Sequence, residues 1–150
     1  MLRKKIYGFI LCLLFGTLAY ADNFAPVVKL VKGEIIQTSS SGGSFQVTVA
    51  LNNIAYDKKV EVIYKLGNGA WEQPLKAKFE SNTGDNMEIW SMKQGNLGEF
   101  ISNPVHFYIR YEIPGGQFAI DDNCGDYYLL DVSAFMGEDD ISVVEGSNCR

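Results

Sequence analysis

Alternation of apolar and polar positions is the main pattern along this chain. From Phe45 to Leu51 every second residue is large and apolar, and the same period recurs in Val60–Tyr64, Leu75–Phe79 and Val105–Glu112. A period of two places neighbouring side chains on opposite faces of a β-strand with one buried face. No stretch after residue 22 keeps a helical period, so the pattern predicts an all-β protein.

Segments rich in glycine and asparagine separate these expected strands. They are Ser41–Ser44, Gly67–Gly69, Thr83–Asn86, Gly95-Asn96 and Pro114–Gly116. Such residues accept the backbone conformations that tight turns require. Frequent turns between short alternating strands favour a sandwich of two packed antiparallel sheets.

The first residues are unlike the rest of the chain. Residues 1–21 combine a basic start, an apolar run from Ile6 to Leu18 and the small-residue pattern Ala19-Tyr20-Ala21, which together predict a secretory signal peptide. The apolar run is too short for a stable membrane-spanning helix. We therefore expect a secreted or periplasmic protein that has no membrane partner after the signal peptide is cleaved.

Cleavage would leave about 129 residues, enough for one domain with its own core. We assign the β-sandwich module to residues 27–131 and an acidic C-terminal tail to residues 132–150. Within that tail, Ile141, Val143 and Val144 predict either a last strand or a clamp on the body of the domain.

The charge of the chain limits its partners. The formal net charge is −5, and loss of Arg3, Lys4 and Lys5 with the signal peptide would make it −8. A protein with this excess of acidic groups repels nucleic acid and anionic membranes. We expect a neutral or basic partner.

Two of the three cysteines, Cys124 and Cys149, follow the expected signal peptide. Exported proteins meet conditions in which thiols oxidise, so we expect a disulfide between them. It would close a loop of about 26 residues and stabilise the fold by roughly 3 to 4 kcal/mol. The alternative is two free thiols.

Groups for catalysis or for metal binding are scarce. The chain has a single histidine, His106, and it falls on the outward face of an expected strand. One histidine and two distant cysteines do not make a transition-metal site. Acidic turns at Asp121-Asp122-Asn123 and Asp139-Asp140 lack the spacing of a known calcium loop, so solvated turns are favoured over calcium sites. We expect no enzyme activity, no metal and no cofactor.

Aromatic residues near turns are the more informative feature. Trp71 follows the turn at Gly67–Gly69, in or beside a loop, where a flat exposed ring suits the apolar face of a pyranose. The alternative is a core tryptophan of the sandwich. Trp90 lies in an alternating strand and is predicted to be core. Tyr108 shares the outward face with His106 and Arg110.

A set of motifs spread from Val27 to Leu130 keeps a recognisable order. Along the chain they are Asn53–Val60, Val62, Tyr64, Trp71, Phe107–Glu112, Ile120–Asn123 and Tyr127-Tyr128. In these motifs the chain resembles carbohydrate-binding module family 21, the starch-binding domains of fungal glucoamylases and similar modules of glycogen-targeting subunits of protein phosphatase 1. The resemblance implies an immunoglobulin-like sandwich that binds α-glucan and catalyses nothing.

The resemblance also implies two sugar sites. The first combines two stacking rings with two hydrogen-bonding groups: Trp71, Tyr108, Asp121 and Asn123. The second combines two rings with a nearby cation: Tyr56, Phe79 and Lys58. Partial burial at a sheet edge is the alternative for the rings of the second site.

Each implied site has lost a ring. Ile120 stands where the family has a third aromatic residue of the first site, and Met87 stands where starch-binding relatives have a tyrosine in the second. Phe118 would substitute for Ile120 if its hairpin presents it outward. Two hypotheses follow: an exported protein that binds starch, glycogen or maltooligosaccharide, or an exported sandwich that contacts a protein and has reduced or lost sugar binding.

Overall fold

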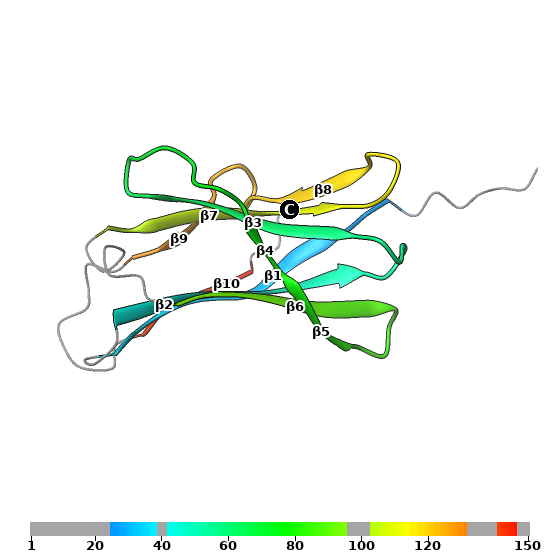
Figure 1. Ribbon diagram of the computed structural model, residues 1–150, viewed down its shortest axis with the longest axis horizontal. Helices are drawn as coiled ribbons and strands as arrows, with labels where there is room; N and C mark the ends of the chain where they lie inside the picture. The colour runs from blue at the N-terminus through cyan, green and yellow to red at the C-terminus, as the bar shows by residue number, and fades with distance from the viewer. Residues whose placement is uncertain (1–24, 39–41, 96–102, 132–140, 147–150) are drawn as a thin grey trace, which may run out of the picture.

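The computed structural model describes residues 25–38, 42–95, 103–131 and 141–146. In these ranges the chain forms two antiparallel sheets that stack face to face (Figure 1). They contain strands and turns and no helix, and therefore no helix capable of crossing a membrane. The predicted all-β immunoglobulin-like sandwich is confirmed.

The first sheet has the strand order β10-β1-β2-β6-β5. Its strands are β1 (Val28–Thr38), β2 (Gly42–Asn52), β5 (Lys78–Asn82), β6 (Met87–Gln94) and β10 (Ile141–Glu145). Strand β10 pairs with β1, so this part of the acidic tail forms a last strand, one of the two predicted alternatives. The expected signal peptide lies outside the described residues.

The second sheet has the strand order β4-β3-β7-β8, and β9 also pairs with β7. Its strands are β3 (Lys59–Leu66), β4 (Leu75–Lys76), β7 (Val105–Glu112), β8 (Phe118–Asp121) and β9 (Tyr128–Leu130). Strand β7 is central because it pairs with three strands, β3, β8 and β9.

The core lies between the sheets and is built from the alternating positions. The inward residues of β7, from Val105 to Tyr111, are fully buried, as is Phe45 on β2. Phe107 packs edge-on against Phe45 at 5.5 Å between ring centroids, and the Tyr111 hydroxyl donates to the backbone oxygen of Asn52 at 3.0 Å. These contacts hold the two sheets together.

Two sequence expectations are wrong. The segment Leu75–Phe79 is not one strand, because the backbone of Ala77 donates to Val60 at 2.9 Å and the chain then crosses from the second sheet to the first. Gly42, Gly43 and Ser44 are not a turn, because they pair with the end of β1.

Candidate functional site

Three aromatic rings from separate parts of the chain meet on the outer face of the second sheet. The Trp71 ring lies 5.2 Å from Tyr108 and 5.0 Å from Tyr127, and the two tyrosine rings are 5.8 Å apart. We call Trp71, Tyr108 and Tyr127 the ring cluster. Trp71 and Tyr127 keep 39% and 37% of their surface exposed, so the cluster is open to solvent.

The turn after β3 positions Trp71. Gly67 adopts a φ of 50°, a left-handed conformation that glycine tolerates without strain, and its N–H donates to Pro104 at 2.7 Å. Trp71 then returns to form a bridge with Lys65. The Lys65 ammonium lies 5.2 Å from the centre of the indole ring, a cation–π contact. The prediction that Trp71 lies in or beside a loop is confirmed.

Strand β7 positions Tyr108. Tyr108 faces outward opposite Ile63 of β3, as the alternation predicts. Ile63 is buried although it is not part of the core between the sheets. Its burial therefore comes from neighbours on the outer face, where the ring cluster lies.

The connection between β8 and β9, residues 122–127, positions Tyr127, and we call it the excursion. Both strands pair with β7: Ile109 is opposite Asp121, and Phe107 is opposite Tyr128. Six residues, 122–127, therefore stand where strand β7 has the single residue Tyr108, so the chain must bulge out there. No local pattern in the sequence indicates this placement, and Tyr127 is not among the predicted binding residues.

Hydrogen bonds within this excursion fix its shape. Tyr127 donates its N–H to the backbone oxygen of Asp122 at 2.8 Å, and the Asp122 carboxylate accepts from the N–H of Gly125 at 3.0 Å. The Asn123 side-chain amide donates to the backbone oxygen of Tyr127 at 3.1 Å. Asn123, predicted to bind sugar, thus braces the residue that carries the third ring.

Asp121, the other predicted hydrogen-bonding group, is engaged by the protein. One carboxylate oxygen accepts from the backbone N–H of Leu30 on β1 at 2.5 Å, and the other accepts from the Tyr128 hydroxyl at 2.8 Å. These bonds tie the end of β8 to the opposite sheet. A direct contact between Asp121 and sugar stays a prediction.

The second predicted site is a groove of about 470 Å³ at the β5 edge of the sandwich. It brings together all three residues predicted there and four others; the lining residues are Asn53, Tyr56, Lys58, Phe79, Asn82, Glu88 and Trp90. Tyr56 is 99% exposed on the connection between β2 and β3, and Phe79 is 48% exposed on the edge strand. The groove thus combines three rings with amide and charged groups.

The inward face of the first sheet explains how the rings come to line the groove. Val49 of β2, Trp90 of β6 and Phe79 of β5 are successive cross-strand partners. Val49 is buried, Trp90 is half-buried and Phe79 is half-exposed, so cover decreases toward the β5 edge. The prediction of Trp90 as core is correct only in part: it packs against the core and also lines the groove.

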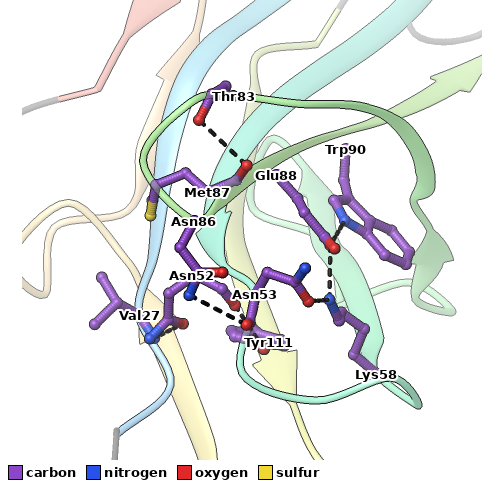
Figure 2. A network of polar contacts seen from close by, with 10 residues as sticks. All are labelled: Val27, Asn52, Asn53, Lys58, Thr83, Asn86, Met87, Glu88, Trp90 and Tyr111. Carbon is purple, nitrogen blue, oxygen red and sulfur yellow. Dashed lines mark hydrogen bonds and ion pairs between the residues drawn. The ribbon is translucent and has the colours of Figure 1, made fainter.

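Two residues that line the groove, Lys58 and Glu88, form an ion pair (Figure 2). The Lys58 ammonium lies 2.7 Å from Glu88 Oε2 and donates to Asn53 Oδ1 at 2.7 Å. The Trp90 indole N–H donates to the same Glu88 oxygen at 2.7 Å.

The Glu88 charge also acts on Tyr111. Burial raises the pKa of Tyr111, and the Glu88 charge raises it further, while a backbone hydrogen bond at Ile54 lowers it in part.

The two positions that depart from the family pattern, Ile120 and Met87, belong neither to the ring cluster nor to the lining of the groove. Ile120 and Phe118 are 48% and 55% exposed on β8, and the Arg110 guanidinium lies 5.3 Å from the centre of the Phe118 ring. Met87 does not line the groove.

Two further expectations reach beyond what the structure can test. Cys149 is outside the described residues, so its bridge to Cys124 stays a prediction, as do the roles of Asp139-Asp140. Within the described ranges no group of three metal-ligating side chains is close enough to hold an ion.

Comparison with known proteins gives one curated relative and several solved structures. Glucoamylase 1 of Rhizopus oryzae is 28% identical over an alignment of 122 residues that covers 77% of this chain and 19% of that protein. The chain therefore spans about a fifth of the length of this relative. No family model matches.

Among solved structures, the starch-binding domain of Rhizopus oryzae glucoamylase in complex with β-cyclodextrin and maltoheptaose matches with 28% identity and a TM-score of 0.53. The match covers 69% of this chain and 92% of that domain. The carbohydrate-binding module of the muscle glycogen-targeting subunit of protein phosphatase 1 matches with 21% identity and a TM-score of 0.47, covering 79% and 80%. The likeness to the glucoamylase domain, in sequence and in fold, confirms the resemblance to carbohydrate-binding module family 21.

Proposed function

We propose that this protein binds α-glucan at two surfaces, the ring cluster and the groove. The observation that carries this proposal is the meeting of Trp71, Tyr108 and Tyr127 on an outer sheet face. Exposed rings are unfavourable in water unless a partner covers them. A sugar offers an apolar face to such rings and hydroxyl groups to the polar side chains around them.

The geometry of the rings favours a curved glucan over a flat one. The Trp71 ring plane makes angles of 82° and 68° with the planes of Tyr108 and Tyr127. A flat β-1,4-glucan ribbon needs rings that lie in one plane, whereas an α-1,4-glucan turns along its length. The related glucoamylase domain, in complex with β-cyclodextrin and maltoheptaose, supports the same class of ligand.

The groove supplies the second half of the proposal. Asn53, Asn82 and the Lys58–Glu88 pair give donors and acceptors beside Tyr56 and Phe79. This combination of flat apolar surface and convergent polar groups is what a sugar ligand requires. A neutral glucan also suits a protein with a net charge of −5.

Within the same proposal the protein is exported and catalyses nothing. The basic start, apolar run and Ala19-Tyr20-Ala21 pattern support export. The single histidine lies on the outer face of β7, opposite Lys65 and Leu129, and the Glu88 carboxylate is already held by Lys58 and Trp90. Both facts favour binding without acid–base chemistry.

Retention on insoluble starch and on glycogen tests this function, with cellulose as the control polymer. We expect wild type to be retained on the α-glucans and not on cellulose. Trp71→Ala should weaken retention, because one stacked sugar buries roughly 100 Å² and contributes about 2 kcal/mol. Wild-type protein that passes through starch and glycogen unretained would contradict the proposal and favour a protein-binding sandwich.

A further inference from the structure

Tyr127 has a backbone conformation that an aromatic residue rarely adopts. Its φ is 60°, and Asn123, Cys124 and Gly125 of the same excursion also have positive φ. A bulky residue in this region is strained unless its surroundings hold it there, and such strain is concentrated at functional sites. Here the hydrogen bonds from Tyr127 to Asp122 and from Asn123 to Tyr127 hold it.

The excursion separates two consecutive tyrosines. Tyr128 is 1% exposed and its ring stacks against Phe107 at 5.3 Å in the core. Tyr127 is 37% exposed and lies against Trp71 and Tyr108. Core packing therefore accounts for Tyr128 and does not account for the ring at Tyr127.

Neighbouring positions on β8 offer no equivalent ring. Ile120 is aliphatic, and its strand partner is Arg110. Phe118 is two residue pairs farther along β7, opposite Glu112, and the Arg110 guanidinium lies over its ring. Among the described residues of β8 and of the excursion after it, Tyr127 is the one whose ring contacts both Trp71 and Tyr108.

We propose that Tyr127 is a third sugar-contacting ring, supplied by the excursion between β8 and β9 where strand β8 supplies none. The inference rests on the proposed function of the ring cluster. It predicts that an α-glucan bound at Trp71 also covers the exposed part of Tyr127. Because only 37% of Tyr127 is exposed, this contact covers less area than one stacked sugar, and its loss corresponds to about a tenfold loss in affinity.

Titration calorimetry with β-cyclodextrin tests the inference in four variants. Tyr127→Asn removes the ring and keeps a residue that tolerates positive φ, and Tyr127→Phe keeps the ring and removes the hydroxyl. Phe118→Ala removes a similar exposed ring outside the cluster, and Trp71→Ala is the positive control. We expect Tyr127→Asn to bind about tenfold more weakly, while Tyr127→Phe stays within threefold and Phe118→Ala within twofold of wild type.

The outcomes separate the inference from the function on which it rests. If Trp71→Ala loses affinity and Tyr127→Asn binds as wild type does, the inference is wrong and the function stands. If wild type binds neither β-cyclodextrin nor starch, both are wrong. Should thermal unfolding show that Tyr127→Asn is poorly folded, NMR signals of the Tyr127 ring in wild type, assigned with Tyr127→Phe, decide: a saturable shift with β-cyclodextrin supports the contact, and no shift overturns it.

Discussion

Lys58 and Glu88 form an ion pair whose side chains are only 3% and 8% exposed. Removing one partner of a buried pair leaves an uncompensated charge and costs about 3 to 5 kcal/mol. We therefore expect Lys58→Met to lower the free energy of unfolding by that amount in urea titrations. Lys58→Met combined with Glu88→Gln should recover much of the loss, because the orphaned charge is gone. A double variant no more stable than the single one would contradict this account.

Tyr111 makes stability depend on pH at the alkaline end. Burial raises its pKa above the ordinary value of 10.0, and the Glu88 charge adds to the shift. The unfolded chain therefore loses this proton at lower pH than the folded one, so stability is fully present below about pH 10 and falls as the pH rises further.

The variant Tyr111→Phe isolates this effect. It should cost about 1 kcal/mol at neutral pH, since the hydrogen bond to Asn52 is lost. It should also reduce the alkaline loss of stability, leaving the share that comes from Tyr64, whose pKa burial also raises. Chemical unfolding at pH 7 to 11 measures the stability at neutral pH and its decrease at alkaline pH. If stability decreases with pH as steeply in the variant as in wild type, Tyr111 does not cause the decrease.

The sequence predicts where some residues of the ring cluster and the groove lie and misses others, for physical reasons. The turn context of Trp71 predicts its place in or beside a loop, and alternation predicts the outward face of Tyr108; their binding roles come from the resemblance and stay predictions. Tyr127 is missed because its position depends on positive φ at four residues between β8 and β9 and on the hydrogen bonds that hold them, which no local pattern encodes. Trp90 is predicted only in part, because alternation tells which face a residue occupies and not how completely the other sheet covers that face.

Strand β1 passes close to strand β7 at Gly33. A Cβ atom added there would lie 2.7 Å from Cζ of Phe107, a ring that is fully buried. Close-packed cores resist such additions, which typically cost about 1 to 3 kcal/mol. We expect Gly33→Ala to lower the melting temperature by several degrees.

Gly84 provides the matched control for this variant. It lies in the turn between β5 and β6, and an added Cβ would meet nothing within 4 Å. Thermal unfolding of Gly84→Ala should match wild type closely. Equal melting temperatures for Gly33→Ala and Gly84→Ala would show that the contact between β1 and β7 is looser than the structure indicates.

Strands with one buried face can be predicted from the sequence, whereas strands whose ends are set by long-range pairing are harder to predict. Strand β7 alternates throughout its length and is predicted with its correct faces. Strands β4 and β5 read as one continuous strand, because the crossing at Ala77 depends on a backbone hydrogen bond to Val60 that no local pattern encodes. Strands β8 and β9 are short, and their register is set by β7.

The two proposed sugar surfaces lie on different parts of the sandwich. The ring cluster lies on the outer face of the second sheet, and the groove lies at the β5 edge of the first. Figure 1 shows these two sheets as separate layers. Few rings contribute at each surface, and ordering the sugar opposes binding, so we expect affinities for short oligosaccharides between tens of micromolar and millimolar. A long glucan that engages both surfaces would be retained more strongly, through an effective concentration near millimolar.

An NMR titration of the ¹⁵N-labelled wild-type protein with maltoheptaose tests the central claim most directly, because it reports every surface at once. The account predicts saturable shifts in two groups: one around Trp71, Tyr108 and Tyr127, and one around the groove from Asn53 to Lys58 and at Phe79. The outward face of β2, such as Thr48, should not respond. An absence of saturable shifts up to millimolar sugar, or shifts confined to other surfaces, would contradict it.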